Sequence, residues 1–175
     1  SNDVHGFGYC MGGHFLAAGC MKAPHHYKSL LFLSTPWDFS CEGYRLAELL
    51  STFAPEIHPR LAISDELDPQ WLHVIFALLE PEQVFTKFAA FADMSENEDA
   101  AQRFVAIQDW LNSIAALPHE LAWTLMTDIV ENNALKRGIL PVNGTTLCAD
   151  TLNRPAFVIA PQNDEIAVPD SVSTL

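Results

Sequence analysis

The sequence predicts an α/β fold in which a parallel sheet is interrupted by a large helical insertion. Residues 1–39 show a strand, a helix and a second strand in close succession. Roughly a hundred residues of helical pattern then follow, where an ordinary connection takes only a handful. A strand-length apolar run returns at 156–160. We therefore predict a sheet core from 1–39 and 139–175, and a helical insertion at 40–138.

The first core segment has the pattern of a β-α-β unit. Val4–Tyr9 is short and glycine-punctuated, which is typical of a strand that enters a tight turn. Small and apolar residues over 12–21 favour a buried helix. The continuous apolar run at 29–34 is typical of a parallel strand buried on both faces.

The middle segment carries repeated helix start and stop signals. Asp68-Pro69 is an N-cap followed by proline at the first helical position. Ser95 with Glu98 forms a capping-box pattern, and Gly138 is a helix terminator. The helical stretches between these signals are predicted over 44–53, 70–80, 81–91, 104–111 and 118–136.

The last segment returns to strands. Asn143-Gly144 separates two short apolar runs and is a strong two-residue hairpin signal. The run at 156–160 leads into a polar loop over 161–165. In open α/β sheets the carboxyl ends of the strands carry the ligand site, so this loop is a candidate site segment.

Charge and composition narrow the function class. Nine basic residues against 22 acidic ones give a net charge of −13, which argues against nucleic-acid partners and against attraction to anionic lipid. No apolar run is long enough to span a bilayer. The four cysteines form no CxxC pair, so we expect reduced thiols in a cytoplasmic setting.

The segment 8–13, GYCMGG, has the spacing G-x-C-x-G of a nucleophile elbow. Such a turn holds its central residue in strained geometry, and the flanking Gly8, Gly12 and Gly13 let the neighbouring chain approach. Cys10 is thus a candidate nucleophile, and its place at a helix N-terminus predicts a favoured thiolate. The backbone N–H of Met11 is a candidate oxyanion donor.

Two other interpretations of this segment stay open. Cysteine is one of the most buried residue types, so Cys10 also fits a structural role. A dinucleotide-binding turn is the weaker alternative, because Met11 stands where the third glycine of G-x-G-x-x-G belongs.

Asp164 is the candidate acid of a catalytic triad. It follows the last predicted strand, and the chain order nucleophile, acid, histidine is that of α/β-hydrolases. Glu165 and Asp170 compete for this role, and a capping role is the structural alternative. All seven histidines precede Asp164; His14 is the nearest to the elbow, and His25-His26 fits a solvated turn. We expect no metal site.

Four segments together resemble polyhydroxyalkanoate synthases, most closely the short proteobacterial poly(3-hydroxybutyrate) synthase-like proteins. They are the elbow at 8–13, the segment STPWDF at 34–39, the run FVAIQDWLN at 104–112 and the loop around Asp164. The resemblance implies a partial α/β-hydrolase fold with an inserted helical cap. It also implies an acyltransferase that polymerises 3-hydroxyacyl-coenzyme A through a Cys-His-Asp triad.

By this resemblance Cys10 carries the growing acyl chain and Asp164 is the triad acid. Trp37 and Asp38 would lie near the pocket, although packing and strand capping is the favoured role for them. The implied partners are the hydroxyacyl-coenzyme A substrate, the polyester chain and a second copy bound through the cap. No cofactor is expected, because coenzyme A arrives as part of the substrate. The implied location is the cytoplasm, including the surface of polyester granules.

The chain departs from the family pattern around its acid and at its ends. The family's D-x-I-V-P loop is one residue longer here, at 164–169. The strands expected before Val4 and the histidine expected after Leu175 lie outside the sequence, so we expect the 175 residues alone to be inactive. The alternatives are an esterase, thioesterase or depolymerase of the same fold, and a non-catalytic interaction protein that retains the fold.

Overall fold

A computed structural model describes residues 4–94 and 97–175. The chain is a mixed α/β protein with a three-stranded parallel sheet and several helices. It divides into two compact units. The first unit combines the chain up to Pro55 with Trp123–Leu175, and the second is Glu56–Ala122. The second unit falls inside the predicted insertion at 40–138, whose own boundaries stay a prediction.

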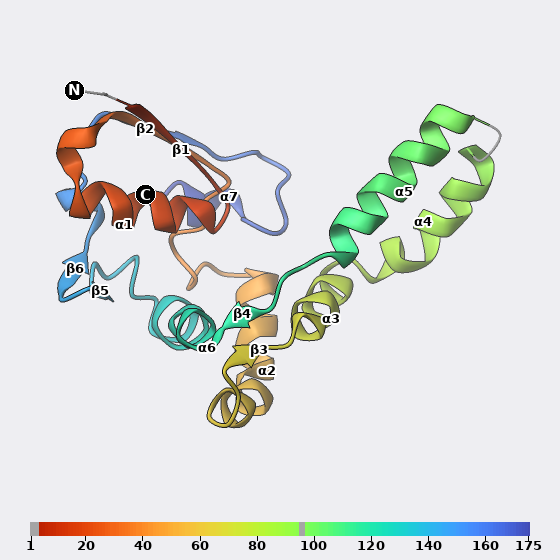
Figure 1. Ribbon diagram of the computed structural model, residues 1–175, viewed down its shortest axis with the longest axis horizontal. Coiled ribbons are helices and arrows are strands. Elements are labelled where there is room, and N and C mark those ends of the chain that lie inside the picture. Colours follow the sequence, from red (N-terminus) through yellow and green to blue (C-terminus); the bar gives the residue numbers. More distant parts are fainter. Residues whose placement is uncertain (1–3, 95–96) are drawn as a thin grey trace. The chain divides into compact units, whose positions relative to one another are not determined.

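The sheet of the first unit consists of β1 (Val4–Tyr9), β2 (Tyr27–Leu33) and β7 (Ala156–Ile159) in the order β1-β2-β7. Both pairs are parallel, with Phe7 opposite Leu31 and Leu31 opposite Phe157. The three strands predicted from the sequence are therefore confirmed as neighbours. Helix α1 (Gly12–Lys22) packs along β1 and β2 (Figure 1).

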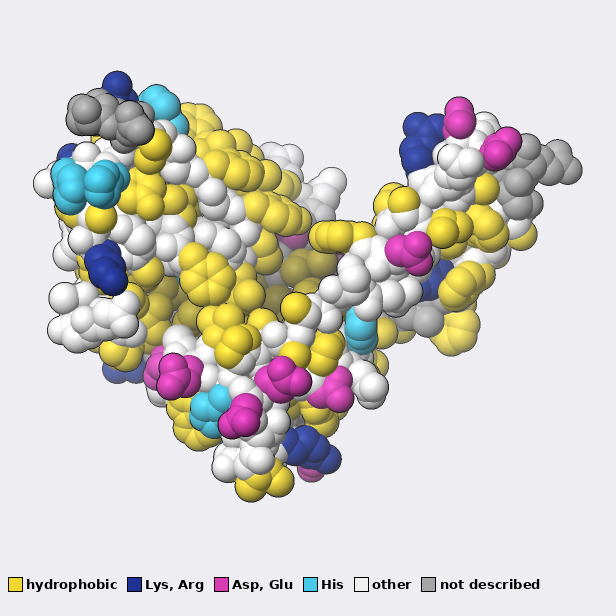
Figure 2. All heavy atoms as spheres, in the orientation of Figure 1, with side chains coloured by type: hydrophobic (Ala, Val, Ile, Leu, Met, Phe, Trp, Pro, Cys, Tyr) yellow, Lys and Arg dark blue, Asp and Glu magenta, His cyan; other side chains and the backbone are white. Residues whose placement is uncertain are grey.

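Only one face of this sheet is covered by the described residues. Leu30 and Phe32 lie on one face of β2 and are 2% and 0% exposed. On the opposite face, Phe7 and Phe157 are 60% and 67% exposed. The prediction that the run at 29–34 is buried on both faces is wrong for the described residues, because Leu31 and Leu33 on this second face are only half-buried. Hydrophobic side chains cover much of the surface that is visible in Figure 2.

The chain between β2 and the final strands is mainly helical. Its bounds are α2 (Arg45–Leu61), β3 (Glu66–Leu67), α3 (Pro69–Leu79), α4 (Pro81–Met94), α5 (Glu98–Asn112), β4 (Leu117–Pro118) and α6 (His119–Trp123). Asp68 caps α3 as predicted, its Oδ1 accepting from the backbone N–H of Gln70 at 2.8 Å. The predicted capping residue Ser95 lies outside the described residues, and Asn97 caps α5.

The last predicted helix ends earlier than expected. After α6 a π-helical segment, Thr124–Glu131, ends before Asn133, whose backbone has a left-handed φ of 48°. Gly138 also has a positive φ of 62°, but it closes the following turn and not the helix. The Oδ1 of Asn133 accepts a hydrogen bond from the backbone N–H of Phe39 at 2.9 Å. A long-range contact therefore coincides with the end of this helix.

The predicted hairpin is confirmed. Strands β5 (Leu140–Val142) and β6 (Thr145–Leu147) pair antiparallel around Asn143 and Gly144, whose φ angles are 48° and 82°. Two consecutive positive φ angles match the turn that Asn-Gly favours. A short helix, α7 (Pro169–Val172), follows the loop after β7. No helix among the described residues is long and apolar enough to cross a membrane.

The crossing of β1 and α1 depends on glycine at two positions. A Cβ on Gly8 would lie 2.6 Å from the Cα of Gly13. A Cβ on Gly13 would overlap the hydroxyl of Thr35 and lie 2.5 Å from its Cγ2. Thr35 is fully buried, so it has little room to move. Gly12, one residue earlier on the same helix, has no neighbour within 4 Å of its virtual Cβ.

We therefore expect Gly13→Ala to destabilise the protein by about 1–3 kcal/mol, the usual cost of overpacking. Gly12→Ala is the matched control, and helix propensity predicts that it is neutral or stabilising by up to about 1 kcal/mol. Urea unfolding followed by circular dichroism measures both. Similar losses for the two variants would show that the close approach of α1 to Thr35 does not limit stability.

Candidate active site at the carboxyl edge of the sheet

Cys10 occupies the turn that joins β1 to α1. Its φ of 51° places it in the left-handed region that residues other than glycine rarely adopt. Its backbone N–H donates to the carbonyl of Leu33 at 2.9 Å, which ties the turn to the end of β2. Its carbonyl accepts from the N–H of Gly13 at 3.0 Å, which starts α1. Such strained residues cluster at functional sites.

The ionisation of Cys10 differs from the prediction. Burial raises the pKa of the Cys10 thiol, the backbone N–H of Met11 lowers it, and the negative charge of Asp164 raises it further. The net direction is upward, so the thiol stays protonated near neutral pH. The helix N-terminus therefore does not by itself yield a favoured thiolate, and nucleophilic attack would require a base.

Asp164 lies in the loop that follows β7 and is half-buried. Its Oδ1 accepts from the backbone N–H groups of Ile166 and Ala167, at 3.0 and 2.8 Å. The two competing acids, Glu165 and Asp170, are exposed. Cys10 follows β1 and Asp164 follows β7, so both lie beyond the carboxyl ends of strands in the same parallel sheet. Asp164 also shapes its own loop, as the structural alternative expected.

His14 is not placed as a base for Cys10. Its ring is 5% exposed, its Nε2 is 2.7 Å from the carbonyl of Pro36, and its edge packs on Trp37 with ring centroids 6.1 Å apart. Burial lowers the pKa of His14, so the ring is neutral and Nε2–H is the donor. Its Nδ1 has no hydrogen-bond partner within the described chain. His14 thus fixes the loop after β2.

Trp37 and Asp38 are held in that loop by distant residues. The hydroxyl of Ser171 accepts from both of their backbone N–H groups at 3.1 Å. Trp37 is 1% exposed, which indicates a packing role. The Asp38 carboxylate accepts from Asn133 Nδ2 at 2.8 Å and Lys136 Nζ at 2.5 Å. No sequence pattern indicates these partners, because each is more than 90 residues away.

Asp38 is ionised in the fold. Burial alone would raise its pKa, but hydrogen bonds from Lys136, Ser40 and Asn133 outweigh burial and bring the pKa well below the ordinary value. The same hydrogen bond raises the pKa of Lys136. The pair therefore joins the loop after β2 to the turn at 133–137 by a charge-assisted bond.

We expect Asp38→Ala to destabilise the protein by about 3 kcal/mol, because it removes a buried acceptor of several hydrogen bonds. The lowered pKa of Asp38 means that its contribution is present above about pH 4, the unfolded value, and is lost as the pH falls further. Unfolding measured from pH 7 to pH 3 should show a shallower acid loss in the variant. Asp150→Ala, at an exposed aspartate, is the control; equal effects would contradict the role of Asp38.

Tyr44 is a further residue at this edge that the sequence pattern did not single out. It is 1% exposed, and its hydroxyl has no hydrogen-bond partner among the residues that the structure describes. Burial and the negative charges of Cys10, Asp164 and Cys41 raise the pKa of Tyr44 far above the ordinary value. A lone tyrosine ahead of an amphipathic helix carries no sequence signal that distinguishes it from a core residue.

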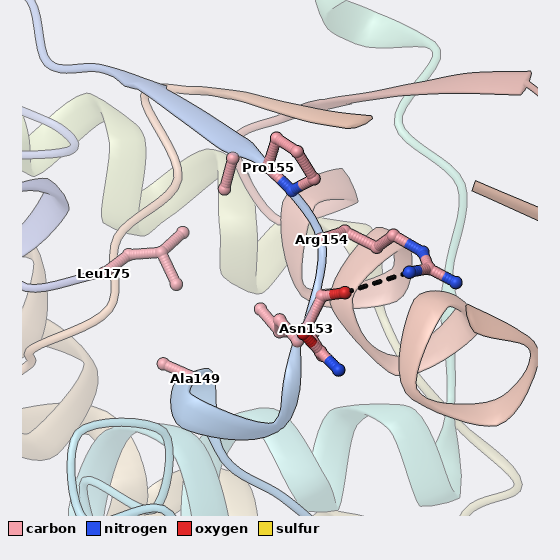
Figure 3. A pocket seen from close by; sticks show the side chains of 7 residues that line it. Ala149, Asn153, Arg154, Pro155 and Leu175 are labelled. Carbon is pink, nitrogen blue, oxygen red and sulfur yellow. Dashed lines mark hydrogen bonds between the residues drawn. The ribbon is translucent and has the colours of Figure 1, made fainter. Parts of the chain in front are cut away.

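A surface hollow of about 320 Å³ lies elsewhere, where the chain enters β7 (Figure 3). Its lining is Ala149, Leu152, Asn153, Arg154, Pro155, Ala156 and Leu175. The Arg154 guanidinium donates to the carbonyls of Pro24 and Asn153, at 2.8 and 3.1 Å. This hollow is at the amino end of β7, whereas Asp164 follows the carboxyl end, so it is separate from the edge that carries Cys10.

Comparison with known proteins gives a consistent set of relatives. No family model matches the chain. The chain is 23% identical to the poly(3-hydroxyalkanoate) polymerase subunit PhaC of Haloferax mediterranei, over 97% of this chain and 35% of the relative. The subunits of the same name from Haloarcula marismortui and Thiocystis violacea are also 23% identical, over 94% and 99% of this chain and 35% and 49% of the relatives. The chain thus spans about a third to a half of the length of these relatives, and its predicted resemblance to polyhydroxyalkanoate synthases is confirmed.

Proposed function

We propose that the chain is the nucleophile-bearing part of an acyltransferase that polymerises 3-hydroxyacyl-coenzyme A into polyhydroxyalkanoate. One observation carries the proposal: Cys10 lies in a strained strand-to-helix turn at the same sheet edge as Asp164. In this proposal the turn is a nucleophile elbow of the α/β-hydrolase type, with Gly8 and Gly13 allowing its close packing, whereas the open surroundings of Gly12 do not require a glycine. Similarity to three poly(3-hydroxyalkanoate) polymerase subunits supports it.

The chemical step is thioester exchange. The Cys10 sulfur attacks the carbonyl carbon of the hydroxyacyl thioester, the carbonyl electron pair moves to oxygen, and the backbone N–H of Met11 donates to that oxyanion. Collapse expels the coenzyme A sulfur, which takes up the proton that Cys10 gave to the base. The acyl group then passes from Cys10 to the hydroxyl of another hydroxyacyl unit, which forms the ester. Exchange between two sulfurs is nearly isoenergetic, so the step needs no other cofactor.

Asp164 has the role of the triad acid in this scheme. A carboxylate beside the imidazole base holds its tautomer and stabilises the imidazolium that forms when the thiol is deprotonated. Following the resemblance, we propose that the base is a histidine outside these 175 residues; His14, the histidine nearest to the elbow, is bonded to Pro36. The raised pKa of Cys10 supports the need for such a base.

The helical segment at 40–138 is proposed as a cap that covers the site and takes part in contacts between two copies. The hairpin of α4 and α5 exposes apolar side chains, among them Phe85 and Trp110, which are 79% and 71% exposed. The proposed partners are hydroxyacyl-coenzyme A and the polyester chain, and the proposed location is the cytoplasm at the polyester granule surface.

The test is to trap the acyl-protein. The natural gene product that carries these 175 residues is mixed with 3-hydroxybutyryl-coenzyme A, quenched with acid and digested. We expect the hydroxybutyryl mass on the peptide that contains Cys10, together with free coenzyme A and ester-linked oligomers. Free 3-hydroxybutyrate without oligomers would favour the hydrolase alternative. Absence of any acyl-protein would favour a non-catalytic interaction protein.

A further inference from the structure

The hydroxyl of Tyr44 is a buried polar group near the candidate active site. The residue follows the loop after β2 and immediately precedes α2. Its ring stacks on Phe39 with centroids 5.6 Å apart, and its side chain is almost completely buried. Within the described residues its oxygen has no hydrogen-bond partner. Tyr44 is therefore fixed by packing while its polar tip is left unpaired.

An unpaired buried hydroxyl needs an explanation, because nearly all buried polar groups in proteins have a partner. A buried hydroxyl that makes no hydrogen bond lowers the stability of the fold, whereas a phenylalanine would fill the same space without that penalty. A hydroxyl kept under these conditions is best explained by a ligand that bonds to it during function.

The place of Tyr44 indicates which ligand. Cys10 follows β1, the loop with Tyr44 follows β2 and Asp164 follows β7, so all three lie beyond the carboxyl ends of adjacent parallel strands. Burial is the main cause that raises the pKa of the Tyr44 phenol, and the negative charge of Asp164 adds to it, so the phenol stays protonated near neutral pH. A protonated phenol beside a nucleophile is a donor for negative charge that develops there.

We propose that Tyr44 is a catalytic residue whose hydroxyl donates a hydrogen bond to the acyl oxygen of a thioester bound at Cys10. This rests on the proposed function. In the tetrahedral intermediate the carbonyl oxygen carries the negative charge, and the hydroxyl of Tyr44 together with the N–H of Met11 supplies two donors to it. The Tyr44 proton stays on its oxygen throughout, so the hydroxyl stabilises charge and transfers no proton.

The experiment compares Tyr44→Phe with Tyr27→Phe in the natural gene product. Tyr27 begins β2, at the opposite end of the sheet, and is the matched control. Two rates are measured at Cys10, acylation by 3-hydroxybutyryl-coenzyme A and alkylation by iodoacetamide. Acylation passes through an oxyanion, whereas alkylation displaces iodide from a saturated carbon and forms none.

We expect Tyr44→Phe to slow acylation by about 100-fold, the scale of losing one oxyanion donor, while alkylation is unchanged. Its melting temperature should be equal to or above that of the natural protein, since an unpaired hydroxyl is removed. Tyr27→Phe should change neither rate.

Three results would overturn the assignment of Tyr44. An unchanged acylation rate shows that the hydroxyl does not touch the reacting oxygen. An equal loss of acylation and alkylation shows that Tyr44 acts on the thiol or on the fold. A lower melting temperature shows that the hydroxyl has a structural partner. A natural protein that is not acylated at Cys10 at all would instead refute the proposed function, and the role of Tyr44 with it.

Discussion

Replacing Cys10 with alanine is expected to abolish acyl transfer in the natural gene product, with a loss on the order of 10⁶-fold, the scale seen when a triad nucleophile is removed. The acyl chain has no other atom to which it can be attached in this scheme. The measurement is coenzyme A release from 3-hydroxybutyryl-coenzyme A. Cys20→Ala, on the buried side of α1, is the control and should retain activity.

Alanine is the informative substitution because it keeps the backbone strain at this position. Cys10 has a φ of 51°, and an alanine there is equally disfavoured, whereas glycine is not. We therefore expect Cys10→Gly to be as inactive as Cys10→Ala but more stable than it by about 1–2 kcal/mol. Acyl transfer that persists in both variants would refute Cys10 as the nucleophile. Equal stabilities would show that the turn is not strained.

The parts of the fold that sequence predicts are those specified by neighbouring residues. Asn143-Gly144 requires two positive φ angles, and Asp68-Pro69 supplies a cap and a first helical residue, so both elements are found where they were predicted. The three core strands are likewise apolar runs of the right length, and they pair in parallel. Local chemistry is sufficient in each of these cases.

The parts that sequence missed depend on residues far apart in the chain. Nothing near Asp38 indicates that Asn133 and Lys136 bind its carboxylate. The sign of the Cys10 pKa shift was missed for the same reason, since burial and the charge of Asp164 arise only in the folded unit. A helix N-terminus is visible in the sequence, and the desolvation that outweighs it is not.

Asp164 combines an observed structural role with a proposed catalytic role, and a pair of substitutions separates the two. Its Oδ1 accepts from the N–H groups of Ile166 and Ala167. Asparagine retains an oxygen at that position and loses only the charge, whereas alanine loses both the oxygen and the charge. We therefore expect Asp164→Asn to keep the loop folded and Asp164→Ala to loosen it, as measured by amide hydrogen exchange over 164–167.

Removing the charge at Asp164 should then change two rates at Cys10 in opposite directions. The carboxylate raises the pKa of the thiol, so Asp164→Asn lowers that pKa, increases the thiolate fraction below it and accelerates alkylation by iodoacetamide. Steady-state acyl transfer should fall on the order of 10⁴-fold, because the base loses the carboxylate that orients it. Asp170→Asn, at an exposed aspartate nearby in the chain, should change neither rate. If both rates fall together, Asp164 acts through the fold of its loop; if acyl transfer is unchanged, Asp164 is not the triad acid and its carboxylate serves only to cap the loop after β7.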